Sequence, residues 1–336
     1  MHEPFMALST TQIFLLSTAV ATLPILLYIA LIYWFDRYEK EPWWLLTATF
    51  FWGAIPSILF AYFFNTLLSA PIYWLTGETL GETISASLIA PVVEESIKGL
   101  AVLAILLIWR NELDSPLDGI IYGAMVGLGF ALVENVFYFM SVYREGGLEA
   151  WGMNVFVRSI VFGLNHALFS SMTGLGIALA RMATRPVVKV AALLGGWSTA
   201  VFLHFLHNFT VSFGNLLCLV ALVSDWGGVL LTLLIIIWAL LQERQWLRQY
   251  LAEEVNLGHL TSSHYLTVCS GRRRIRAQLT CFLYDGPIAY WRLVRYHQNL
   301  SELAYKKRHF ALFHDDDSRE LIEALRQKIL VSSPGF

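Results

Sequence analysis

Seven long apolar segments constrain the fold of this chain more than any other feature. A helix needs about 20 mostly apolar residues to cross a bilayer. The segments that qualify cover roughly residues 12–35, 43–70, 84–109, 117–143, 154–181, 187–213 and 215–241. Hydrophobic residues make up 57 % of the 336 residues and charged residues 14 %, whereas soluble domains carry about 25 % charged residues. We therefore expect an all-α, polytopic transmembrane helical bundle of about seven spans.

The distribution of charge divides the chain after the last apolar segment. We expect residues 1–241 to form a membrane-embedded domain and residues 242–336 to form a small, helical, soluble tail. Basic residues lie in the loops after the first, third and fifth spans and throughout the tail, whereas the loops on the other side carry only Arg144. Because cytoplasmic loops are enriched in Lys and Arg, we predict an N-terminus outside and a cytoplasmic tail.

The tail shows two local signals. Residues 242–255 continue the helical pattern of the last span, and Asp315–Asp317 predict a helix start, because acidic residues stabilise the positive end of the helix dipole. A basic cluster comprises Arg272, Arg273, Arg274 and Arg276. Beside a membrane each such charge attracts anionic lipid by about 1 kcal/mol, and a solvated surface is the simpler alternative.

Ionisable side chains inside the spans gather in four of the seven, some with amides next to them. Charged groups in a bilayer are costly, and those that occur are usually functional or paired. The groups are Glu94, Glu95 and Lys98 in span three, Glu134 and Asn135 in span four, Arg158 and His166 in span five, and His204, His207 and Asn208 in span six. We expect spans one, two and seven to contribute no ionisable residue apart from their ends, and Gly227 and Gly228, which follow Asp225, to break or weaken the last span.

Helix geometry places these groups in one layer of the membrane. Lys98 can reach both Glu94 and Glu95 along one helix face, whereas the two adjacent glutamates lie about 100° apart and cannot share a face. With a rise of 1.5 Å per residue, one group in each of four spans lies about 13–18 Å from the outer end of its helix: Glu94, Glu134, His166 and His204. This common depth indicates a site rather than scattered structural charges.

Carboxylates and imidazoles in a membrane cavity suit hydrolysis of a peptide bond in or near the bilayer. They are zinc ligands that leave a position open for water, and a bound metal makes that water a nucleophile. Without a metal, a buried Glu and a His activate water directly. The chain lacks the HExxH motif of common zinc proteases, so the residues alone leave both mechanisms open.

Four ordered motifs resemble the PrsW family of intramembrane proteases, which is related to the CAAX-prenyl-protease and bacteriocin-immunity superfamily. The similarity covers about residues 33–212, including the loop DRYEKEP at 36–42. The motifs are EExxK at 94–98, PLDGIIYG at 116–123, FxxxEN at 130–135 and HxxxN at 204–208, with His166 between the last two. The chain departs from the family in placing His207 inside the last motif and in its long tail.

The resemblance implies an intramembrane endopeptidase that performs regulated proteolysis of a membrane-anchored, anti-sigma-factor-like protein. Its site residues would be Glu94, Glu95, Glu134, His166 and His204, supported by Lys98, Asn135 and Asn208. We expect a metal, zinc by default, bound by His166, His204 and Glu134. The expected partners are the membrane-anchored substrate and the lipid bilayer, with no nucleic acid. The alternatives are a metal-free glutamate-type hydrolase and a proton- or cation-coupled transporter, although the chain lacks the internal repeat typical of transporters.

Several residues also have structural interpretations. The amides Asn135 and Asn208 are either oxyanion donors or links between helices. His166 taken alone suits a core histidine bonded to Ser170, and Arg158 suits a partner for a buried carboxylate. A glycine series at four-residue spacing predicts a face for close helix packing: Gly119, Gly123 and Gly127.

Overall fold

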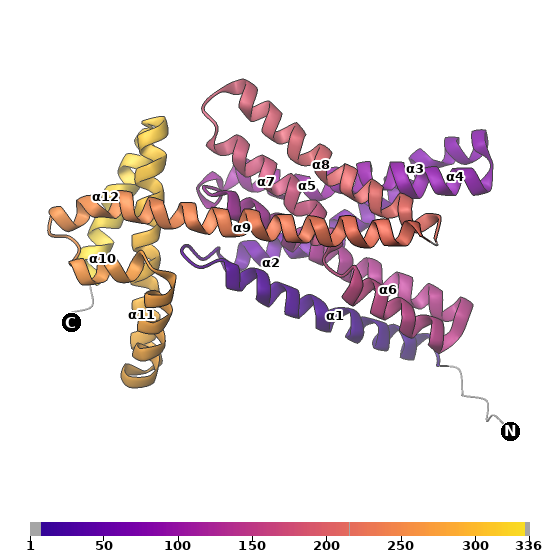
Figure 1. Ribbon diagram of the computed structural model, residues 1–336, viewed down its shortest axis with the longest axis horizontal. Coiled ribbons are helices and arrows are strands. Elements are labelled where there is room, and N and C mark those ends of the chain that lie inside the picture. The colour runs from indigo at the N-terminus through magenta and orange to yellow at the C-terminus, as the bar shows by residue number, and fades with distance from the viewer. Residues whose placement is uncertain (1–7, 215, 333–336) are drawn as a thin grey trace. The chain divides into compact units, whose positions relative to one another are not determined.

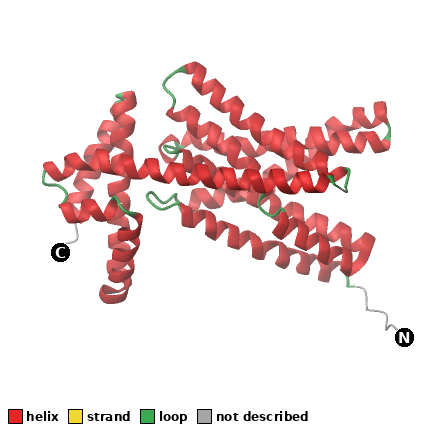
Figure 2. Cartoon of the chain, in the orientation of Figure 1, coloured by secondary structure: helices red, strands yellow, loops and turns green. Residues whose placement is uncertain are grey.

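The structure, a computed structural model, describes residues 8–214 and 216–332, and its regular elements are helices throughout that range (Figures 1 and 2). Two compact units share the chain. The first holds the described residues up to Phe35 together with Pro42–Leu234, and the second holds Asp36–Glu41 and the described residues from Ile235 onward. The loop after the first helix thus belongs to the same unit as the tail.

The first unit contains the helices that position the site. In chain order they are α1 (Thr10–Phe35), α2 (Trp43–Trp52), the π-helical turn η1 (Gly53–Ser57), α3 (Ile58–Thr76), α4 (Glu78–Ile84), the π-helical turn η2 (Ser85–Ile89), α5 (Ala90–Ile108), the 3₁₀ turn η3 (Arg110–Glu112), α6 (Pro116–Phe156), the π-helical turn η4 (Val157–Val161), α7 (Asn165–Met182) and α8 (Pro186–Ser212). Helix α9 (Leu217–Asn256) continues from this unit into the second.

Five stretches of the described helices are long and apolar enough to cross a membrane: Thr10–Phe35, Trp43–Thr76, Pro116–Met182, Pro186–Ser212 and Leu217–Asn256. They confirm an all-helical fold with several candidate membrane spans but not the expected count of seven. Helix α5 is absent from this set, and it carries Glu94, Glu95 and Lys98. The 67-residue stretch holds both α6 and α7, and its backbone leaves the helical conformation at Gly147, where φ is 71°.

Helix α9 is continuous, so the expected weakening at Gly227 and Gly228 is wrong. The predicted start of this span at residue 215 lies outside the described residues. A Cβ added at Gly228 would lie 2.8 Å from Leu168 Cδ2, closer than ordinary van der Waals contact. The glycine therefore lets α9 approach α7 closely, and a single glycine costs a helix only about 1 kcal/mol.

The glycine series of α6 forms the close contact with α7 that its spacing predicts. A Cβ on Gly119, Gly123 or Gly127 would lie only 2.1–2.3 Å from a backbone carbonyl oxygen of α7. For Gly127 that oxygen belongs to His166. The opposite side of α6 is equally tight, since a Cβ on Gly129 would lie 1.9 Å from the carbonyl oxygen of Phe50 in α2. Helix α6 is thus fixed between two neighbours by direct backbone contact.

The second unit is built from the end of α9, α10 (Ser262–Val268), α11 (Gly271–Phe313) and α12 (Asp316–Ser332). The continuation of the last span and the helix after the acidic run are both confirmed. Buried residues from each helix form its core, together with Tyr38 of the loop: Leu247, Leu251, Val268, Tyr296, Leu300, Leu303, Leu325 and Ile329.

Candidate active site

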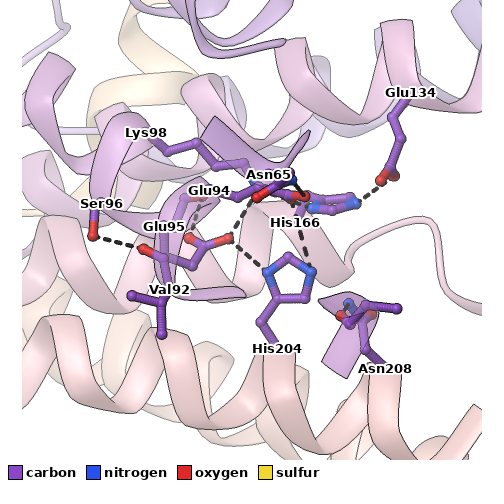
Figure 3. Close-up of polar contacts among 12 residues, drawn as sticks. Asn65, Val92, Glu94, Glu95, Ser96, Lys98, Glu134, His166, His204 and Asn208 are labelled. Carbon is purple, nitrogen blue, oxygen red and sulfur yellow. Dashed lines mark hydrogen bonds and ion pairs between the residues drawn. The ribbon is translucent and has the colours of Figure 1, made fainter. Parts of the chain in front are cut away.

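The two adjacent glutamates of α5 have different surroundings, as their angular separation predicts (Figure 3). Glu95 is fully buried and accepts three hydrogen bonds. Its Oε1 accepts from Lys98 Nζ at 2.9 Å and from His204 Nδ1 at 3.0 Å, and its Oε2 accepts from Ser170 Oγ at 3.0 Å. Ser170 therefore bonds to Glu95, and the expected bond from Ser170 to His166 is not formed.

Glu94 faces the other way and lines a cavity of about 340 Å³. Its Oε2 accepts from Lys98 Nζ at 3.4 Å, and its Oε1 accepts from Asn65 Nδ2 at the same distance. His204 Nε2 lies 3.9 Å from Glu94 Oε2, beyond hydrogen-bonding distance. Lys98 thus neutralises both glutamates of its helix, and Glu94 keeps weaker contacts than Glu95.

His166 of α7 lies between Lys98 of α5 and Glu134 of α6 and contacts both. Its Nε2 lies 2.8 Å from Glu134 Oε2, and its Nδ1 lies 3.1 Å from Lys98 Nζ. Glu134 also accepts a hydrogen bond from Arg158 Nη2, so the expected pairing of Arg158 with a carboxylate is confirmed. Because Gly127 contacts the His166 backbone directly, the packing of α6 on α7 sets the position of this ring.

His204 of α8 is held from two sides. Its ring stacks on Phe169 with centroids 4.9 Å apart, and it meets the His166 ring edge-on at 5.3 Å. Its Nδ1 donates to the Glu95 carboxylate, which is an acceptor, so the proton lies on Nδ1. Its Nε2 is the ring nitrogen near Glu94, 3.9 Å from Glu94 Oε2.

The structure brings four of the five predicted site residues to one cavity wall, namely Glu94, Glu134, His166 and His204. Glu95 lies behind this wall. Among the described residues, Glu94, His166 and His204 place one possible ligand atom each within 4.8 Å of one another. This set contains both predicted histidines, and it contains Glu94 where we expected Glu134.

The donor set suits a small divalent cation. Bonds of about 2.0–2.2 Å in a tetrahedral site place ligand atoms about 3.3–3.6 Å apart, so the three ligand atoms would have to move closer together to bind one ion. Imidazole and carboxylate are ligands that zinc accepts. The carboxylate of Glu95 behind His204 is the outer partner that metal-bound histidines usually have.

The two supporting amides line the cavity and also link helices. Asn208 Nδ2 donates to the backbone carbonyl of Ala86 at 2.8 Å, which joins α8 to η2. Asn135 Oδ1 accepts from Arg158 Nε at 2.9 Å. Both amides therefore make the interhelical bonds that were one of their two predicted roles.

Sequence reasoning missed Asp225 of α9, which was expected to matter only as a neighbour of two glycines. Its side chain is buried, and its Oδ2 accepts from His207 Nδ1 at 2.7 Å and from Asn165 Nδ2 at 2.9 Å. His207 and Asn165 both line the cavity. The last span thus supplies a charge, contrary to expectation, and a lone acid in an apolar segment was the signal for it.

A helical protein with several candidate membrane spans and a Glu–His cluster on a cavity has the features of an intramembrane metalloprotease. Residues 41–241 match the model of the family described as PrsW family intramembrane metalloprotease. The chain belongs to this family, as its four motifs suggested, and a protease of this class acts on membrane proteins.

The curated relatives agree with this assignment. The chain is 30 % identical to Protease PrsW of Geobacillus kaustophilus over 179 residues. This aligned region covers 52 % of this chain and 68 % of the relative. The chain is 33 % identical over 156 residues to Protease PrsW of Clostridioides difficile (46 % and 62 %) and 27 % identical over 205 residues to that of Bacillus subtilis (60 % and 82 %). No solved structure matches the chain. The family match ends at residue 241, before most of the second unit.

Proposed function

We propose that this protein cleaves a peptide bond of a membrane-anchored protein at the cavity wall formed by Glu94, His166 and His204, with zinc as the bound metal. The observation that carries the proposal is the cluster of three ligand atoms within 4.8 Å on a cavity of about 340 Å³. When bound there, the metal would supply a water that is nucleophilic at neutral pH.

Glu95 and Lys98 prepare this wall from behind. Glu95 holds the proton of His204 on Nδ1, so that Nε2 is free to act as a ligand. Because all three hydrogen bonds of Glu95 are made inside the protein, we assign it a positioning role and assign the ligand role to Glu94. Lys98 offsets the two carboxylates, since an unpaired buried charge is strongly destabilising.

Glu134 is the cavity carboxylate outside the three-residue cluster, and we assign it the role of general base. His166 Nε2 and the Arg158 guanidinium hold its carboxylate at the cavity, where it could accept a proton from water. The Arg158 guanidinium also lines the cavity, where it would stabilise negative charge on the substrate carbonyl.

The remaining parts of the proposal concern topology and substrate. We propose seven spans, with α5, α6 and α7 each crossing the membrane, an N-terminus outside and residues 242–336 in the cytoplasm. The distribution of basic residues among the loops supports this orientation. The resemblance to the family supports a membrane-anchored, anti-sigma-factor-like substrate and a role in regulated proteolysis.

Metal analysis of the purified full-length protein tests the proposal without knowledge of the substrate. We expect about one zinc per chain in chelator-free wild type and none in a His166→Ala/His204→Ala variant. A His259→Ala/His264→Ala variant, which removes two histidines of the second unit, is the matched control and should keep the metal. Metal-free wild type that still cleaves a co-reconstituted single-span membrane protein would overturn the metal assignment in favour of a glutamate mechanism.

A further inference from the structure

Helix α11 is a helical hairpin rather than one rod (Figure 1). Its backbone leaves the helical conformation at Gly286, where φ is 86°, and Pro287 follows. The two arms run antiparallel, because residues at similar distances before and after this turn are in contact. Arg274 Nη1 donates to Ser301 Oγ at 2.9 Å. Nearer the turn, the rings of Phe282 and Tyr290 lie 5.6 Å apart.

The tip of this hairpin exposes large apolar side chains. Tyr284 is 83 % exposed, Ile288 71 % and Trp291 65 %. The first arm adds a stripe at the helical spacing i, i+4 and i+7: Ile275, Leu279 and Phe282. The core of the second unit leaves these side chains uncovered, so the hairpin has an apolar surface made of aromatic and branched residues.

Arginines accompany this surface. Residues 271–295 contain six arginines and one acidic residue, Asp285, which gives the hairpin a net charge of +5. Of the basic cluster seen in the sequence, Arg274 turns inward to Ser301, and burial lowers its pKa to about 10. Arg272, Arg273 and Arg276 remain exposed, as do Arg292 and Arg295 of the second arm.

We propose that this hairpin is a membrane-interface anchor, with its apolar tip in the headgroup region of the bilayer and its exposed arginines on anionic lipid headgroups. Exposed Trp, Phe and Leu combined with arginines on one helix are typical of helices that lie in the membrane interface. The hairpin follows α9, which is long and apolar enough to cross a membrane, so a membrane-spanning α9 would keep it close to a bilayer and raise its effective concentration there.

The positive charge of the hairpin favours a lipid surface, rather than a second copy of the chain, as the partner of its apolar tip. Two hairpins would bring net charges of +5 against each other, whereas an anionic leaflet carries the opposite sign and attracts basic residues near its surface.

Spin labelling of the full-length protein in vesicles tests this anchor. A nitroxide is placed at Tyr284→Cys in a chain whose native cysteines are replaced, and its relaxation by oxygen, which partitions into lipid, is compared with relaxation by a water-soluble nickel chelate. In vesicles with 30 % phosphatidylglycerol we expect at least a threefold higher oxygen-to-nickel ratio than for a label at the control position, Gln327→Cys. Gln327 is exposed on α12 of the same unit.

The charge contribution has its own control. We expect the ratio at Tyr284→Cys to fall toward the Gln327→Cys value in pure phosphatidylcholine, and in an Arg272→Gln/Arg273→Gln/Arg276→Gln variant that keeps the wild-type melting temperature. Equal ratios at the two label positions in anionic vesicles would overturn the anchor. Spin–spin broadening between tips, independent of lipid composition, would assign the surface to a second copy and would also overturn it.

Discussion

Two regions of the chain concentrate buried charge, and they use it differently. In the first unit, Lys98 bridges Glu94 and Glu95 beside the cavity. In the second unit, Glu254 accepts from Lys307 at 2.7 Å and from Arg326 at 2.8 Å. Both networks combine carboxylates with lysine or arginine and a histidine, so their composition does not distinguish them.

Access to open space distinguishes the two networks. Leu260, Leu300 and Leu303 close around Glu254, and the gap between them has no volume for a water molecule. Beside Glu94, a cavity of about 340 Å³ remains, and a ring nitrogen of His204 is directed toward it. The comparison teaches that a closely packed cluster of buried charges is by itself only a sign of a structural ion-pair network. A catalytic or metal-binding role is indicated when some of those groups also face a cavity.

The largest expected effect separates the networks by activity. Glu94→Gln keeps the shape of the side chain but removes a proposed ligand, and we expect cleavage in proteoliposomes to fall by about 10³-fold. Glu254→Gln removes the buried anion that Lys307 and Arg326 share, while Lys307 keeps Glu253 and Arg326 keeps Glu323, so it should destabilise the second unit by about 1–3 kcal/mol. Cleavage per folded molecule should stay at the wild-type level in Glu254→Gln, and equal losses of activity in both variants would contradict the comparison.

The second prediction concerns the positioning role of Glu95. Glu95→Gln removes the anionic acceptor behind His204, and the loss of such an outer partner weakens metal binding by about 10–100-fold. Zinc titration of the full-length protein in detergent measures this change. The variant should still bind metal at high concentration, unlike His204→Ala, and an unchanged affinity would show that Glu95 is merely structural.

The third prediction uses the close contact of α6 with α7. Gly127→Ala places a Cβ 2.1 Å from the carbonyl oxygen of His166, and overpacking of this kind costs about 1–3 kcal/mol. We expect a lower melting temperature and cleavage reduced by about tenfold, because His166 must move. Gly195→Ala is the control, since no atom lies within 4 Å of its added Cβ; that variant should be as stable as wild type or more so.

The smallest expected effect is at Asp225. Asp225→Asn retains the size of the side chain but weakens the hydrogen bonds from His207 and Asn165, which should cost about 1–3 kcal/mol of stability. We expect cleavage to fall by less than tenfold, because neither partner belongs to the proposed metal cluster. Thermal unfolding and initial cleavage rates measure both quantities, and a loss as large as that of Glu94→Gln would place His207 at the centre of the site.

Much of this arrangement follows from helical periodicity. The angle between Glu94 and Glu95, the reach of Lys98, the glycine face of α6 and the helices of the tail all depend on spacing along one helix. The number of spans depends instead on which helices carry charged residues and on where the backbone leaves the helical conformation, as at Gly147. Helix α5 carries three charged residues, Glu94, Glu95 and Lys98. These charges make it harder to recognise as a span from its composition.

The position of each residue along its helix could not predict that Glu94, rather than Glu134, lies with the two histidines in the three-residue cluster. Glu94 and Glu134 lie at nearly equal depths on their helices, so the distinction depends on which side chain points toward His204. Arg158 engages Glu134 from beyond the kinked end of α6, and that contact depends on the turn at Gly147. Asp225 was missed for the same reason, since its partners lie 18 and 60 residues away in the chain.

The backbone contact between α6 and α7 also bears on how such a protease adapts to new substrates. At Gly119, Gly123 and Gly127 even one added carbon would overlap the neighbouring helix, so this interface between α6 and α7 tolerates almost no variation. The cavity walls contributed by η2, η4 and the end of α8 carry ordinary side chains such as Ala86, Val157 and Val211. We expect changes in substrate preference to arise from substitutions at those positions, whereas the glycines that pack α6 against α7 near His166 stay unchanged.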